Sequence, residues 1–161
     1  MKRVALFAAL GGIALCMGLY LVMSSWAGTT LEVRGELVQQ MRRIGNVKAE
    51  ATSRFTEADS IVVTKYLILD IDGSTIDEVM GKALNSPELR SWAVESDRSP
   101  SWVQLRSRSW ANTLLTLEPL KGRPVDAVSS VELREAIAAS LKRARNTDKL
   151  LIVSLRRTDT T

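Results

Sequence analysis

The chain has 161 residues, of which 45% are apolar and 25% are charged, enough for one compact domain and an accessory segment. Lys and Arg number 22 against 18 Asp and Glu, and this mild excess argues against a dedicated nucleic-acid-binding protein. The chain has no His and a single Cys, which excludes an intrachain disulfide and a histidine base. We therefore expect no metal and no cofactor.

Residues 4–23 form an apolar run without a single charge. At about 1.5 Å per residue a helix of this length spans about 30 Å, the thickness of the hydrocarbon core of a bilayer. The run predicts a transmembrane signal-anchor helix within residues 1–27, and thus a single-pass membrane protein. Lys2 and Arg3 precede the run and favour a cytoplasmic N-terminus, with the following domain periplasmic or extracellular.

A cleavable signal peptide is the alternative interpretation of the same segment. Ser25 and Ala27 are small residues at suitable positions before a cleavage site at Gly28. The apolar run is longer than the usual signal-peptide core of about 7–15 residues, which favours an uncleaved anchor.

Residues 28–60 show a loose heptad pattern, with Leu37, Ile44 and Ala51 at intervals of seven. Such spacing places one apolar stripe on a helix and predicts a helical stalk or linker that self-associates or packs on the domain. Glycine is unfavourable inside a helix, so a break is expected near Gly45. The alternation from Val47 to Phe55 is also compatible with a strand.

Residues 61–157 predict a small α+β domain followed by a polar tail, 158–161. The segment 61–71 is apolar on both alternating rows, as in a central strand, and Thr75-x-x-Glu78 and Ser129-x-x-Glu132 are helix-capping boxes. Two strands meet in a hairpin around Ala111-Asn112. The predicted order is strand 61–71, helix from 75, strands 102–110 and 113–117, helix from 129, and strand 150–155. This is the β-α-β-β-α-β order of a ferredoxin-like domain, with two helices on one face of a four-stranded sheet.

A hydrophobic strand that ends in Asp70-Ile71-Asp72-Gly73 resembles the first motif of haloacid-dehalogenase-like phosphatases. The resemblance implies a nucleophile at Asp70, a general acid/base at Asp72 and a bound Mg²⁺. The alternative interpretation is that these residues end the strand and turn into the next helix, because Asp and Gly favour turns.

A second candidate site lies on the predicted strand 102–110. Its even positions form one row, Trp102, Gln104, Arg106, Arg108 and Trp110, opposite the apolar pair Val103 and Leu105. Trp and Arg are enriched in protein–protein hot spots, so we expect Trp102, Arg106, Arg108 and Trp110 to bind a partner. The alternative is that the tryptophans pack on the rim of the sheet and the arginines are solvated.

These features together predict a membrane-anchored structural or assembly component of a cell-envelope complex, and no enzyme. The layout is similar to that of platform proteins of bacterial secretion and pilus machines. Expected partners are the lipid bilayer and other membrane-complex proteins or a second copy, and no nucleic acid. The alternatives are an enzyme with a phosphatase-like site at Asp70 and Asp72, or a module that binds anionic ligands through the Trp/Arg strand.

Overall fold

The structure, a computed structural model, describes residues 29–57, 59–98, 101–121, 123, 128, 130–144 and 146–158. These ranges contain seven strands, three α-helices and two 3₁₀ turns. The strands are β1 (Thr29–Leu31), β2 (Asn46–Glu57), β3 (Ser60–Asp70), β4 (Trp92–Arg98), β5 (Trp102–Ser107), β6 (Thr113–Pro119) and β7 (Leu150–Arg157). The helices are α2 (Gly35–Met41), α3 (Ile76–Leu84) and α4 (Val131–Arg143), with the 3₁₀ turns η1 (Pro87–Leu89) and η3 (Thr147–Lys149).

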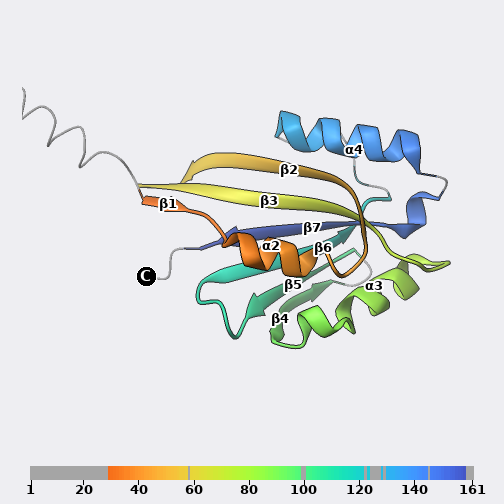
Figure 1. Cartoon of the computed structure of the whole chain (residues 1–161), viewed down its shortest axis with the longest axis horizontal. Helices are drawn as coiled ribbons and strands as arrows, with labels where there is room; N and C mark the ends of the chain where they lie inside the picture. The colour runs from red at the N-terminus through yellow and green to blue at the C-terminus, as the bar shows by residue number, and fades with distance from the viewer. Residues whose placement is uncertain are drawn as a thin grey trace, which may run out of the picture.

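The described strands form one sheet, in which β7 lies at the centre (Figure 1). Strands β3, β7, β6, β5 and β4 follow one another as antiparallel neighbours, and β2 pairs with the whole length of β3 on the other side. The short β1 runs parallel to the beginning of β3, on the side that β7 occupies further along. The two long edges of the described sheet are therefore β2 and β4, and the three-residue β1 also pairs on one side only.

Helices cover both faces of this sheet. On one face, α2 and α3 enclose a core with the row that contains Leu67, Leu69 and Val153. On the other face, which we call the α4 face, Leu133 and Ile137 of α4 pack on the opposite row, which contains Ile68 and Ile152. The apolar character of both rows of β3 follows from this arrangement, because a strand covered on both faces has no solvated row.

Local signals in the sequence explain where several elements begin and end. The side chain of Thr75 caps α3 by accepting a hydrogen bond from the backbone N–H of Glu78, and Ser130, rather than Ser129, caps α4. Asn112 has a positive φ of 58°, which suits the turn between β5 and β6. Gly45 lies where the chain crosses the end of β3, and a Cβ atom there would lie 3.0 Å from the carbonyl oxygen of Asp70.

The predicted layout of a helical stalk followed by a ferredoxin-like domain is wrong. The segment 28–60 contributes β1 and β2 to the same sheet as the rest of the chain and α2 to the core on one of its faces, and β4 forms where no strand was expected. The sheet is larger than four strands, and its helices lie on both faces rather than on one. The alternation from Val47 to Phe55 prevails over the heptad because all of these residues except Lys48 gain a paired position beside β3.

The predicted single-pass membrane arrangement is contradicted as well. Within the described ranges, no helix combines the length and the apolar character needed to cross a bilayer. The longest of them, α4, has 13 residues and a polar outer surface. The predicted span, residues 4–23, lies outside the described residues.

Candidate functional site

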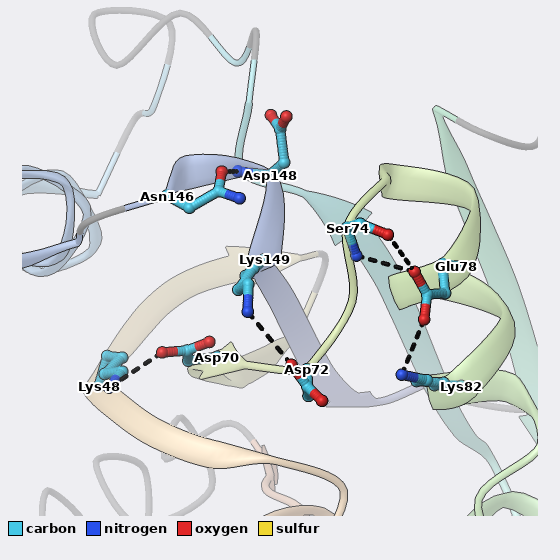
Figure 2. Close-up of polar contacts among 9 residues, drawn as sticks. All are labelled: Lys48, Asp70, Asp72, Ser74, Glu78, Lys82, Asn146, Asp148 and Lys149. Atoms are coloured by element: carbon cyan, nitrogen blue, oxygen red, sulfur yellow. Dashed lines mark hydrogen bonds and ion pairs between the residues drawn. The ribbon is translucent and has the colours of Figure 1, made fainter.

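The two aspartates of the phosphatase-like motif lie at the end of β3 and do not converge (Figure 2). Asp70 forms an ion pair with Lys48 across 3.0 Å, and Asp72 forms one with Lys149 across 3.1 Å. The side chain of Asp72 is 91% exposed. Each carboxylate is thus neutralised by a different lysine at the surface, as the turn interpretation expects.

The next acidic group along the chain, Glu78, has its own partners on α3 (Figure 2). One carboxylate oxygen accepts hydrogen bonds from the backbone N–H and the hydroxyl of Ser74, at 2.8 and 2.7 Å, and the other lies 2.9 Å from the ammonium of Lys82. Lys82 and Ser74 together lower the pKa of Glu78 to about 2. In the described part of the chain, no three acidic or cysteine side chains are arranged to hold a metal ion.

The four residues of the Trp/Arg candidate do not share one face. Trp102 and Arg106 lie on the α4 face of β5, where Arg106 forms an ion pair with Glu95 of the edge strand. Strand β5 ends at Ser107, so the alternation expected to continue to 110 stops there, and Arg108 is an exposed residue of the following turn.

Trp110 lies on the opposite face of the sheet from Trp102. It packs against the core under α2 and α3, and the guanidinium of Arg34 lies 5.4 Å from the centre of its ring. This cation–π contact stabilises the position of a partly buried ring at the edge of the core. The expectation of a single Trp/Arg row is therefore corrected, and partner binding by these residues stays a prediction.

A different surface has the features of a binding site: the outer edge of β2. Among the described residues, this strand of 12 residues pairs only with β3, so its second row of backbone N–H and C=O groups is unpaired by any strand. Helix α4 lies beside β2 over most of the strand. Its C-terminal end borders Asn46–Lys48, and its N-terminal end borders Thr52–Phe55.

A depression of about 830 Å³ opens where β2 emerges from beside α4. Phe55 and Val131 line it together with Tyr66, and they are 41% and 57% exposed. They are two of the four large apolar side chains that are exposed within the described ranges. Domains that bind an extended peptide at a sheet edge combine an unpaired strand with exposed apolar side chains. Backbone hydrogen bonds to the peptide give affinity, and pockets for its side chains give selectivity.

The two edges of the sheet differ in how they are protected against pairing. The seven-residue β4 has an irregular register in its middle, between Val94 and Ser96. In β2 the irregularity lies near the beginning, between Val47 and Ala49, and the register is regular from Ala49 to Glu57. Bulges on edge strands discourage pairing, so the regular part of β2 is less protected than β4.

No family model, no curated protein and no solved structure matches this chain.

The binding features of β2 were missed at the level of sequence because the segment was assigned to a helical stalk. The signal that could have found them is the alternation of small and larger residues from Val47 to Phe55. It ends in an aromatic side chain, Phe55, that has no place in the core. A solvent-facing Phe near the end of a strand is a reason to look for a partner.

Proposed function

We propose that this domain is a structural or assembly component that binds partner proteins, and that it does so by adding an extended strand of the partner to the edge of β2. The observation that carries the proposal is the regular part of β2, Ala49–Glu57, whose outer side pairs with no described strand, beside the depression formed by Phe55 and Val131. The partner strand would continue the sheet by backbone hydrogen bonds, and one of its apolar side chains would fill the depression.

The electrostatics of this edge favour a protein segment of mixed charge. The depressions along β2 are lined by both signs of charge, with Arg54 and Lys65 beside Glu50 and Glu132. A surface dedicated to an anionic polymer would instead present one sign of charge. Backbone pairing tolerates many side chains, and the alternating charges then select the register.

Site-specific photo-crosslinking tests the proposal. A photoreactive phenylalanine analogue replaces Phe55 in the whole chain, expressed in its natural host, and the same analogue at Val94 serves as the matched control. Val94 is a suitable control because it is an exposed apolar residue on the other edge, 59% exposed, next to the irregular register of β4.

We expect irradiation to produce a discrete adduct at position 55 and none at position 94. Mass spectrometry should map the adduct at position 55 to one extended segment of one protein. Absence of an adduct at position 55, or equal labelling at both positions, would refute the proposed function.

A further inference from the structure

We infer that the strand added to β2 is β2 of a second copy of this chain, related by a two-fold axis that passes through Thr52. The inference rests on the proposed function and names the partner of the same edge. The resulting dimer would have one continuous sheet across both copies, with the two β2 strands antiparallel at its centre.

The alternation of side chains limits the registers in which β2 can pair with itself. Glu50 and Arg54 lie on the face of α2, since they pair with Leu67 and Val63 of β3. Residues that lie opposite each other in an antiparallel pair have their side chains on the same face of the sheet. The two-fold axis must therefore pass through a residue and not between two residues. When the axis moves by one residue, the residue opposite any given position changes by two.

Among the registers centred beyond Ala49, in the regular part of β2, only one sets opposite charges across the axis. Centred on Thr52, each Glu50 lies opposite Arg54 of the second copy, and this happens twice because of the symmetry. Centred on Ala51 or Ser53, Glu50 faces a threonine instead. In the part of the chain that the structure describes, Arg54 has no ion-pair partner, whereas Glu50 has Arg42 at 2.7 Å. The dimer would therefore give a partner to a guanidinium that lacks one.

The exposed aromatic side chain also finds a place in this arrangement. Phe55 lies on the α4 face, and the register sets it opposite Ala49 of the second copy. Ala49 is partly buried against the core beneath α4, so a Phe ring above it would extend that core across the interface.

Disulfide trapping in the whole chain, purified in mild detergent, tests the axis directly. In a background in which Cys16 is replaced by Ser, Thr52→Cys places two thiols opposite each other on the axis, at a Cα separation that a disulfide can span. The matched control is Thr56→Cys, on the same face. Its copies would lie eight strand positions apart, about 27 Å at about 3.4 Å per residue, which no disulfide can span. Under mild oxidation we expect a covalent dimer from Thr52→Cys and little from Thr56→Cys.

Charge exchange tests the register. Arg54→Glu sets two like-charged pairs across the axis and should weaken dimerisation about tenfold, as measured by sedimentation equilibrium. The double variant Glu50→Arg with Arg54→Glu restores opposite charges and should recover most of the loss. Circular dichroism of each variant confirms that the domain remains folded.

A chain that stays monomeric at every concentration, or equal trapping by the two cysteine variants, would overturn the inference. If photo-crosslinking at Phe55 then still captures one segment of another protein, the proposed function stands and only the second copy is excluded. If position 55 captures nothing, both fall.

Discussion

The docking of α4 can be tested by truncating the side chain at its centre, Ile137→Ala. Ile137 is fully buried between the helix and the sheet, in the same cluster as Ile68 and Leu133. The change removes three carbon atoms, or about 2.4 kcal/mol at about 0.8 kcal/mol for each buried methylene. The cavity left behind adds to this loss, so we expect the free energy of unfolding to fall by about 3–4 kcal/mol.

The measurement is urea denaturation followed by far-UV circular dichroism, with the unfolding free energy extrapolated to water. The matched control is Val131→Ala on the same helix, which removes an exposed side chain and should cost less than about 0.5 kcal/mol. A loss below about 1 kcal/mol for Ile137→Ala would show that α4 does not form a core with the sheet, and the assignment of its covering role would be wrong.

Three further predictions concern the end of β3 and the helix α3 that follows it. Gly45→Ala should lower the free energy of unfolding by about 1–3 kcal/mol, measured by urea denaturation, because its Cβ would press on the backbone carbonyl of Asp70; an unchanged stability would contradict the close approach. An NMR pH titration should find the pKa of Glu78 near 2, below its ordinary value of 4.5, and Lys82→Met should raise it. Because this pKa is lowered on folding, the contribution of Glu78 to stability is complete above pH 4.5 and declines as the pH falls towards 2. Asp70→Asn removes an exposed ion pair with Lys48 and should cost at most about 1 kcal/mol. Magnesium-dependent hydrolysis of a phosphate ester by the parent chain, lost in that variant, would revive the phosphatase interpretation.

Several elements could be predicted from local chemistry. The two apolar rows of β3, the cap at Thr75 and the turn at Asn112 all depend on residues close in sequence, and the structure confirms them. The predicted helical stalk was wrong because the same segment is compatible with both a helical and a strand periodicity. Leu37 and Ala51 fit a heptad, but Ala51 also fits a strand, and only the pairing with β3, a tertiary contact, decides between them.

The side on which each helix packs could not be predicted either. The two apolar side-chain rows of β3 indicate that both faces of the strand are buried. No pattern within α4 indicates on which of the two rows the helix packs. The candidate site failed for a related reason. The predicted Trp/Arg row assumed that the strand continues to 110, and the chain instead turns after Ser107, which sends Trp110 to the other face.

The position of β7 has a consequence for how the chain acquires its structure. This strand is the last one described along the chain, yet it separates β3 from β6 (Figure 1). Until Leu150–Arg157 is synthesised, the earlier strands can form only two groups, β1–β3 and β4–β6, that share no ladder. The edge strands of the two groups, β3 and β6, are apolar, and both pair with β7 in the complete sheet. Apolar edge strands without a partner promote aggregation. Pairing β3 with a strand so distant in sequence also slows folding, because a long loop must close first. The complete sheet can therefore form only after β7, the last described strand, has been synthesised.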